Sequence, residues 1–252
     1  MSAINFFSKI YRRYSIRYKL DQMTLDLKRI QTKMTMEDDI WGIPNAKFYL
    51  PHYPIDLIAR EIVDNNNFYE IDILKELDAY VPKDACICDI GANIGNHTLY
   101  WYTVRKAKKI YAFEPVKKTF DILKRNIEIN DCGGVLPYNI GLSDEDGSAE
   151  IMTFRADNLG ATHIKKDKDG LMRLRTLDSY KIPEKIDFIK IDVEGFEHYV
   201  LKGAKETIAR CHPFVFIETY PDHFNEVHSQ LKSYGYDILR EFPHYNYLYG
   251  KA

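Results

Sequence analysis

The candidate chemistry of this sequence lies where runs of apolar residues end in polar ones. The first such place is Asp89–Gly95 (DIGANIG), which follows the run ACIC. Two glycines four positions apart allow a tight turn and a close ligand approach, and the N–H groups that open a following helix attract anions. The segment lacks the Gly-x-Gly-x-x-Gly spacing of dinucleotide sites, and Asp89 would repel a pyrophosphate. It is either a loop for another cofactor or only a strand-to-helix turn.

Two further runs end in groups that suit a nucleoside. Glu114 closes the run KIYAF about twenty residues after the glycines, where a carboxylate can accept hydrogen bonds from both ribose hydroxyls. Alone, Glu114 would be an ordinary solvated carboxylate, and its significance comes from the glycine loop before it. The turn after the third run could contact an adenine edge or be an ordinary turn. It contains Asn139, Gly141, Leu142, Ser143 and Asp144.

The fourth run carries ionisable residues at alternate positions. Lys190, Asp192 and Glu194 would share one face of a strand, because side chains alternate between the two faces. Charged groups buried along a strand are costly unless they are used or paired, so this pattern indicates a functional site or a structural ion-pair network. Glu218 ends the fifth run at the same edge and could belong to the site or stabilise its neighbours.

The elements that position these residues alternate regularly. From Lys83 onward, short runs rich in β-branched and apolar residues alternate with segments of helical periodicity, which predicts an α/β fold with a parallel sheet. Ligands of such sheets bind beyond the carboxyl ends of the strands. A polar loop at residues 155–170 would be an insertion or hairpin, and the last two runs would form a β pair. We expect helices at residues 96–105, 120–129, 198–210 and 223–234.

Two segments precede this core, so we divide the chain into residues 1–40, 41–82 and 83–252. Residues 41–56 contain three prolines and lead into two short helices, near 56–63 and 68–80.

The first forty residues form a basic, helical extension. Apolar residues spaced three and four apart match the a and d positions of two heptads, which indicates packing on another helix. This seam could join a second copy of the chain or pack on the main domain, and the basic face could instead dock weakly on a membrane surface. The seam residues are Leu20, Met23, Leu27, Ile30 and Met34.

Composition excludes several classes of protein. The 252 residues are 45% hydrophobic and 29% charged, with a net charge of −2, so overall charge gives no reason to expect nucleic acid. No stretch approaches the about 18 apolar residues that span a bilayer, and no secretory signal is evident. Four cysteines lack motif spacing, so we expect free buried thiols and a cytoplasmic location. They are Cys86, Cys88, Cys132 and Cys211.

Taken in order, these segments resemble the FkbM family of S-adenosylmethionine-dependent methyltransferases. The matching stretches are DIGANIGNHTL, AFEPVKKTFDILKRNIEIN, NIGLSDEDG, TLDSY, IDFIKIDVEGFEHYVLKGA and PFVFIE, which together span about residues 83–220. The resemblance implies a Rossmann-like, seven-stranded class I methyltransferase sheet whose last strand is antiparallel. It does not cover the N-terminal extension.

The resemblance also implies residue roles. The glycine loop would surround the methionine part of the cofactor, and Glu114 would bind the ribose hydroxyls. The turn after the third run would lie by the adenine, and Asp192 would face the cofactor's amino group or the acceptor. His97 would pack or contact the cofactor. The predicted cofactor-binding set is Asp89, Gly91, Ala92, Asn93, Gly95, His97, Glu114, Pro115, Asn139, Gly141, Leu142, Ser143 and Asp192.

Family members mostly methylate hydroxyl groups, often on sugars of bacterial glycans or on secondary metabolites. A sugar hydroxyl needs a base to take its proton, and the candidates are Asp192, Glu194 and His163, the last from a loop that could close over the acceptor. As a less favoured alternative, Asp192, Glu194 and Glu218 could hold a Mg²⁺ that acidifies a sugar diol.

Other functions remain as alternatives. A dinucleotide-dependent oxidoreductase is disfavoured by the glycine spacing, and a scaffold without activity is disfavoured by the complete acidic set. A nucleic-acid methyltransferase usually has a proline-aromatic motif after the fourth strand, where this chain has DVEG. We therefore expect a hydroxyl acceptor that is a sugar or small molecule and no nucleic-acid partner.

Overall fold

A seven-stranded sheet forms the centre of the protein. The computed structural model describes residues 3–153, 157–158 and 162–251, with side chains described from Arg17 onward. In spatial order the sheet is made of β12 (Tyr236–Phe242), β13 (Asn246–Lys251), β11 (Phe214–Glu218), β10 (Phe188–Ile191), β3 (Cys86–Ile90), β4 (Lys109–Phe113) and β5 (Val135–Tyr138). β13 pairs antiparallel with both β11 and β12, and the other pairs are parallel. The predicted sheet with an antiparallel last strand is confirmed.

The connectivity creates a crevice beside the two central strands. β3 and β10 are neighbours, with Asp89 opposite Lys190 and Ile90 opposite Ile191. From β3 the chain crosses to β4 on one side, whereas from β10 it crosses to β11 on the other side. The loops that follow the two strands therefore diverge at one edge of the sheet, where ligands of such folds bind.

Helices follow the strands, with two departures from the expected bounds. The helix predicted for residues 96–105 is a single α-turn followed by a π-helical turn, and the helix predicted for 198–210 breaks at Ala204 (φ −110°, ψ 6°), which is fully buried. A π-helical turn of this kind is rare and often marks a functional site. The elements are α4 (Asn96–Leu99), the π-turn Tyr100–Val104, α5 (Lys117–Ile129), α6 (Glu197–Gly203), α7 (Lys205–Cys211) and α8 (Pro221–Ser233).

A second, four-stranded sheet stands where a loop was expected. Its strands, in spatial order, are β6 (Gly141–Leu142), β9 (Met172–Arg175), β7 (Gly147–Thr153) and β8 (His163–Lys166). The hairpin alternative for residues 155–170 is confirmed at β8, whose four residues pair with β7 in an antiparallel ladder, so a polar loop over the whole range is wrong. The predicted third strand is likewise divided, and its second part joins this small sheet.

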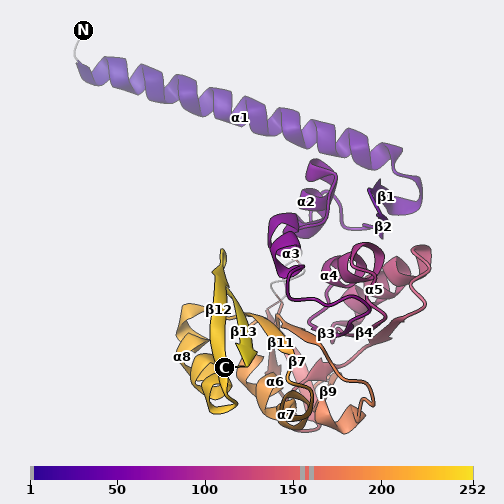
Figure 1. The fold of residues 1–252 in the computed structure, drawn as a ribbon. Helices are drawn as coiled ribbons and strands as arrows, with labels where there is room; N and C mark the ends of the chain where they lie inside the picture. The colour runs from indigo at the N-terminus through magenta and orange to yellow at the C-terminus, as the bar shows by residue number, and fades with distance from the viewer. Residues whose placement is uncertain (1–2, 154–156, 159–161, 252) are drawn as a thin grey trace.

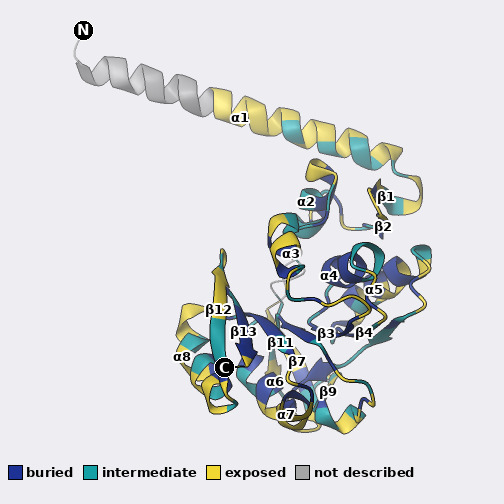
Figure 2. Ribbon diagram, in the orientation of Figure 1, coloured by how far each residue is buried: buried dark blue, intermediate teal, exposed yellow. Residues whose placement is uncertain are grey.

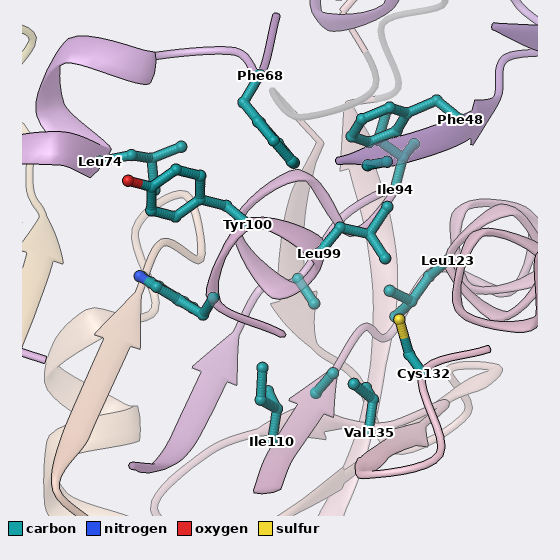
Figure 3. Close-up of a cluster of buried hydrophobic side chains, with 14 of the residues drawn as sticks. Phe48, Phe68, Leu74, Ile94, Leu99, Tyr100, Ile110, Leu123, Cys132 and Val135 are labelled. Carbon is teal, nitrogen blue, oxygen red and sulfur yellow. The ribbon is translucent and has the colours of Figure 1, made fainter. Parts of the chain in front are cut away.

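Residues 40–77 pack over the amino-terminal half of the core. They form β1 (Ile40–Ile43), β2 (Ala46–Tyr49), α2 (Leu57–Asn65) and α3 (Ile71–Leu77), so a hairpin precedes the two predicted helices. Asp56 caps α2 by accepting a hydrogen bond from the N–H of Ala59. Phe68 connects this segment to the core, with its ring edge-on to Phe48 and to Tyr100 at centroid distances of 5.8 and 5.3 Å (Figure 3).

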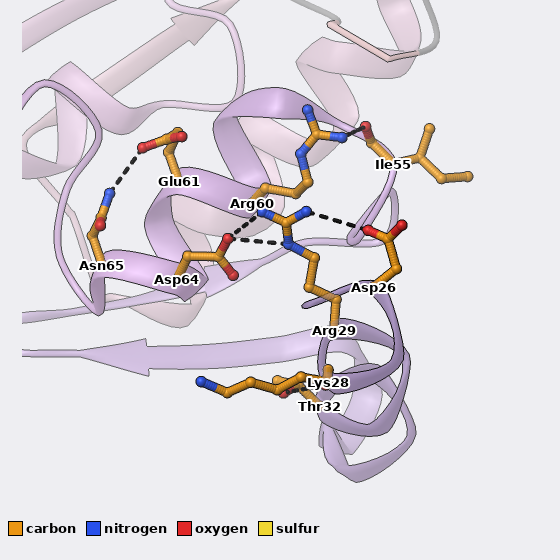
Figure 4. Close-up of polar contacts among 9 residues, drawn as sticks. All are labelled: Asp26, Lys28, Arg29, Thr32, Ile55, Arg60, Glu61, Asp64 and Asn65. Atoms are coloured by element: carbon orange, nitrogen blue, oxygen red, sulfur yellow. Dashed lines mark hydrogen bonds and ion pairs between the residues drawn. The ribbon is translucent and has the colours of Figure 1, made fainter. Parts of the chain in front are cut away.

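Helix α1 (Ala3–Thr35) extends away from the rest of the chain (Figure 1). It meets the body through polar groups near its carboxyl end, where Arg29 Nη2 lies 2.5 Å from Asp64 Oδ2 (Figure 4) and Lys33 contacts the Leu50 carbonyl. The five seam residues are 50% to 81% exposed, as the yellow face in Figure 2 indicates. The expectation that the seam might pack on the main domain is therefore wrong, and self-association and membrane docking stay predictions. No helix in the described part of the chain is long and apolar enough to cross a bilayer.

Candidate active site

A buried lysine organises the edge of the sheet. β10 places Lys190 between the two diverging loops, and its Nζ donates to the Gly91 carbonyl at 2.5 Å. The same Nζ lies 3.3 Å from Asp192 Oδ2 and 3.5 Å from Asp89 Oδ1. Burial opposes the charge of Lys190, but the two carboxylates outweigh it and raise the pKa of the ammonium. Of the three charged residues predicted on one face of the strand, only Lys190 lies in β10, which ends at Ile191; this lysine is ion-paired with Asp192 and with Asp89 of β3.

Asp89 belongs to this group rather than to a ligand surface. Its side chain is fully buried, and Oδ2 accepts a hydrogen bond of 2.5 Å from Thr98 on α4. Its other oxygen forms an ion pair with Lys190, so both carboxylate oxygens contact groups of the protein. Asp89 lines neither of the two cavities described below. The sequence-based role of Asp89 at the cofactor therefore becomes, in the structure, a role in holding Lys190 and α4.

The glycine loop is shaped by packing between the two strand ends. Gly91 has a φ of +75°, and a Cβ there would lie 1.8 Å from the Asp192 carbonyl oxygen. Gly95 has a φ of +94°, and its Cβ would lie 2.7 Å from Leu123. Any other residue at Gly91 would push the two loops apart, so this glycine admits the neighbouring backbone rather than a ligand. Gly95 lines neither cavity.

The first cavity, of about 60 Å³, lies over the ends of β3 and β4 and has mainly apolar walls. Glu114 lines it, with Oε2 accepting from the Asn93 N–H at 3.0 Å and Oε1 from the Val116 N–H at 2.8 Å. Burial raises the pKa of Glu114 to about 7. Gly91 and Pro115 also line this cavity. The apolar walls are Ile90, Phe113, Val116, Ile140, Leu142 and Phe196.

Only part of the turn that was expected to contact adenine lines the first cavity. Gly141 and Leu142 line the first cavity. Asn139 does not, because its Nδ2 donates to the carbonyls of Glu114 and Pro115 at 2.9 and 3.0 Å. Ser143 is buried and its hydroxyl donates to Asp144. Asn139 and Ser143 therefore hold the turn and the end of β4 in place.

A second cavity of about 270 Å³ adjoins the first and is rich in carboxylates. This volume is near the lower end for small-molecule sites. Asn93, Asp192 and Glu194 line both cavities, so they form the wall where the two meet. The second cavity also contains Ala92, His97, Lys190, Glu218 and Tyr220 from the core, and Ile58, Tyr69 and Glu70 from the segment before it.

The surroundings of three glutamates in the second cavity disfavour the ionised carboxylate and raise its pKa. Burial and then the negative Asp192 raise the pKa of Glu70 and of Glu194 to about 7 each. The same causes, with the repulsion of Glu194 and Glu70 added, raise the pKa of Glu218 to about 9. Carboxylates that share a site cannot all ionise freely, and perturbed groups of this kind gather at functional sites.

Three polar atoms at the cavities have no hydrogen-bond partner among the described residues, namely Asn93 Oδ1, His97 Nε2 and Glu194 Oε2. The Asn93 side-chain oxygen is buried at the shared wall. His97 is 9% exposed, and its Nε2 lies 3.8 Å from Glu70 Oε2, beyond hydrogen-bond distance. Burial and then the charge of Lys190 lower the pKa of His97 to about 3, so its ring is neutral. Such unpaired buried atoms are costly in a native protein and indicate contacts made by a ligand.

His163 occupies a different position from the other candidate bases. Its ring on β8 is about half exposed, and Nδ1 is 3.0 Å from the Glu194 carbonyl oxygen. It lines neither cavity, although its neighbours Thr162 and Ile164 line the first. In this structure His163 holds the loop that carries Glu194.

The residues proposed for a metal do not converge. Among the residues that the structure describes, no three His, Cys, Asp or Glu side chains have an arrangement that could hold a metal ion. The Mg²⁺ alternative at Asp192, Glu194 and Glu218 thus gains no support from side-chain positions.

Sequence reasoning missed Tyr69 and Glu70, and it grouped Lys190 with Asp192 and Glu194 without identifying Asp89 as its buried partner. Tyr69 and Glu70 precede the family-like region, and no motif marks them. Glu70 has a φ of 56°, a strained value for this residue type that sequence does not reveal. A buried ion pair at Lys190 could have been predicted, because a lysine inside an otherwise apolar strand needs a buried partner.

Comparison with known proteins agrees with this geometry. A family model described as the methyltransferase FkbM domain matches residues 89–247. The methyltransferase sdnD of Sordaria araneosa is 30% identical over 232 residues, covering 76% of this chain and 88% of that protein. The hexuronic acid methyltransferase AglP of Haloferax volcanii is 33% identical over 158 residues, covering 60% and 62%.

Among solved structures, a methyltransferase FkbM from Methylobacillus flagellatus KT aligns with a TM-score of 0.46 and 18% identity, covering 76% of this chain and 60% of that one. The family match covers more than half of the chain and overturns the alternative of a dinucleotide-dependent oxidoreductase. The chain belongs to the FkbM family of S-adenosylmethionine-dependent methyltransferases, and its α/β fold has the seven-stranded sheet expected for that family.

Proposed function

We propose that this enzyme transfers the methyl group of S-adenosylmethionine to a hydroxyl of a sugar, in a surface glycan or its nucleotide-sugar precursor. The observation that carries this proposal is the pair of adjoining cavities, one with mainly apolar walls and one polar, which meet at Asn93, Asp192 and Glu194. Methyl transfer from a sulfonium requires acceptor oxygen, methyl and sulfur in line, and two cavities with a common wall can provide that alignment.

We assign the nucleoside of the cofactor to the first cavity. Its apolar walls suit an adenine, and the Glu114 carboxylate can accept hydrogen bonds from ribose hydroxyls in place of, or in addition to, its backbone partners. The unpartnered oxygen of Asn93 can accept a hydrogen bond from the cofactor's ammonium group. When bound, the cofactor supplies an electrophilic methyl group. The chain's own residues must then orient the acceptor and remove its proton.

Glu194 is the proton acceptor that the geometry favours. Its Oε2 is buried with no hydrogen-bond partner among the described residues, at the wall shared by the two cavities. A carboxylate whose pKa is about 7 is well matched to proton transfer at neutral pH. Asp192 is ion-paired to Lys190 and would orient the acceptor or the cofactor's ammonium group. We propose Glu194 as the base and Asp192 as its positioning partner.

The sugar acceptor is supported by the polarity of the second cavity and by the name of one relative, the hexuronic acid methyltransferase AglP. The four cysteines are buried free thiols, which supports a reducing cytoplasmic location.

The test is incubation of the purified chain with methyl-labelled S-adenosylmethionine and a panel of sugars, nucleotide sugars and glycan fragments. We expect label on an oxygen of a sugar product, located by NMR. Label on nitrogen or carbon, or transfer only to acceptors without a sugar, would refute the proposal. Titration with S-adenosylhomocysteine checks the cofactor site independently.

A further inference from the structure

We infer that the acceptor is an amino sugar, whose protonated amine lies between Glu70 and Glu218 in the second cavity while a nearby hydroxyl receives the methyl group. This inference rests on the proposed function and adds the chemical class of the acceptor. It follows from the charges of the cavity, from an unpaired imidazole in its wall, and from the part of the chain that supplies the selective residues.

The second cavity has more negative than positive groups. Four carboxylates line it, and the sole lysine or arginine among its described lining residues is Lys190. Lys190 is already used, because its ammonium group contacts Asp89, Asp192 and the Gly91 carbonyl. In the part of the chain that the structure describes, neither Glu70 nor Glu218 lies within ion-pair distance of a lysine or arginine. Among the described residues, these two glutamates therefore have no lysine or arginine partner of their own, although the more distant charge of Lys190 acts on both.

A cationic ligand would relieve this arrangement. The raised pKa values of Glu70 and Glu218 come from burial and from repulsion by Asp192, so an ammonium group placed between them lowers the cost of ionising both. A neutral sugar brings hydroxyl groups but no countercharge. A uronic acid adds another carboxylate to a site that already disfavours them. The cavity therefore ranks amino sugars above neutral sugars and neutral sugars above uronic acids.

His97 supplies an independent sign of a ligand in the same cavity. The residue is 9% exposed and lines the cavity, and its buried Nε2 has no hydrogen-bond partner among the described residues. Because the ring is neutral, Nε2 can accept a hydrogen bond from a hydroxyl or an ammonium group without adding charge. Tyr69 and Tyr220 line the cavity as well and offer ring faces to a sugar. The described lining thus includes a neutral hydrogen-bond acceptor, four carboxyl groups and the three tyrosines Tyr69, Tyr220 and Tyr245.

Two of the residues that set this preference lie outside the segment matched by the family model. Tyr69 and Glu70 precede residue 89, where the family match begins. Glu70 stands directly before α3 in a left-handed conformation, and the Tyr69 N–H and carbonyl are both held by the Asn96 amide at 2.9 and 3.0 Å. The segment before the core is thereby fixed against the cavity. An acceptor preference built on it need not follow that of AglP, a relative named for hexuronic acid.

The cofactor's own charges do not replace the acceptor's amine. S-adenosylmethionine carries one ammonium and one sulfonium group, and Asn93, Asp192 and Glu194 at the shared wall are the groups next to the first cavity. Glu70 and Glu218 line the second cavity alone. Saturating the enzyme with S-adenosylhomocysteine, which keeps the amino group, fills the cofactor's position before any sugar is added.

The test measures binding of three matched sets of sugars to the full-length chain saturated with S-adenosylhomocysteine. The sets are glucosamine and galactosamine, glucose and galactose, and glucuronic and galacturonic acid, titrated by calorimetry near pH 7. We expect at least one amino sugar to bind about tenfold or more tighter than its parent hexose, and the uronic acids to bind most weakly. Equal affinity for the parent hexoses, tighter uronic acid binding, or no binding of either amino sugar would overturn the inference.

Variants assign the effect to the named carboxylates. Glu70→Gln and Glu218→Gln should each reduce the amino-sugar preference about tenfold while leaving S-adenosylhomocysteine affinity within about twofold. Asp72→Asn, which removes an exposed charge from α3, is the matched control and should leave the preference unchanged. An unchanged preference in both glutamine variants would overturn the inference.

Methyl transfer separates this inference from the function on which it rests. If sugars are methylated on oxygen but neutral or acidic sugars react best, the amino-sugar assignment fails and the proposed function stands. If S-adenosylhomocysteine binds and sugars bind, but no sugar is methylated, the proposed function fails. Label on the nitrogen of glucosamine would overturn both assignments, because the amine would then be the nucleophile rather than the held cation.

Discussion

Replacing Glu218 by glutamine should reduce the stability that the protein loses as the pH rises, so the variant should be more stable than the wild type near neutral pH. In the folded state, burial and the repulsion of Asp192, Glu194 and Glu70 raise the pKa of Glu218 to about 9. In the unfolded chain, a glutamate has its ordinary pKa of about 4.5. Between these two pH values the folded state binds one proton more than the unfolded state at this site. The free energy of unfolding therefore falls as pH rises through this window, and Glu218→Gln removes this part of the loss.

The magnitude follows from the proton difference. One extra proton bound in the folded state changes the free energy of unfolding by about 1.4 kcal/mol per pH unit, or about 2.7 kcal/mol across two units. Glu218 is partly exposed and shares its repulsion with Glu70 and Glu194, which relax when it is neutralised. We therefore expect Glu218→Gln to gain about 1–2 kcal/mol on the wild type between about pH 5.5 and pH 7.5.

The assay is urea unfolding of both proteins at these two pH values without cofactor. The control is Glu128→Gln on α5, where the side chain is about half exposed and its nearest cations are 3.8 and 3.9 Å away. The control should keep the pH dependence of the wild type. If Glu218→Gln also keeps it, the carboxylates of the second cavity do not repel one another as argued, and the charge argument for the acceptor loses its basis.

Four further variants test the site and the N-terminal helix. Lys190→Met should destabilise the fold by about 3–5 kcal/mol, seen as a lower Tm, because Asp89 would remain buried without its cation; an unchanged Tm would contradict this. Glu194→Gln should lower kcat about 10²-fold and abolish the rise of kcat with pH through about 7, and a retained rise would assign the base elsewhere. Asn93→Ala should weaken S-adenosylmethionine binding about tenfold in calorimetry, whereas unchanged affinity would leave Asn93 a turn residue. Leu27→Asp in the exposed seam should reduce the mass found by sedimentation if two copies join through α1, and an equal mass for both proteins would remove that prediction.

Most of the sheet and the shared wall of the two cavities could be predicted from the sequence. Strands β3, β4, β10 and β11 are short apolar runs closed by a polar residue, and this pattern is local, so it is visible without the fold. Parallel strands bring their carboxyl ends to one edge, which is why Glu114, Asp192 and Glu194 could be grouped before any contact was known. Their positions at the cavities agree with that grouping.

The roles of Asp89 and Gly91 show the limit of that reasoning. Position and residue type alone made both candidates for contact with the cofactor. In the structure the Asp89 carboxylate accepts a hydrogen bond from Thr98 and forms an ion pair with Lys190. The absence of a Cβ at Gly91 allows the Asp192 backbone to pack against it. These partners are distant in the chain, with Gly91 and Lys190 99 positions apart, so no local pattern records them.

The sequence by itself determined the fold, the family and the edge of the sheet at which chemistry occurs, because periodicity and motif spacing are properties of neighbouring residues. Tertiary structure decided which carboxylates remain available. It paired Asp89 with the buried lysine, brought Glu70 from the preceding segment into the same cavity as Glu218, and left His97 Nε2 without a hydrogen-bond partner among the described residues. Burial and charge depend on everything that packs around a group, and only the folded chain brings those groups together.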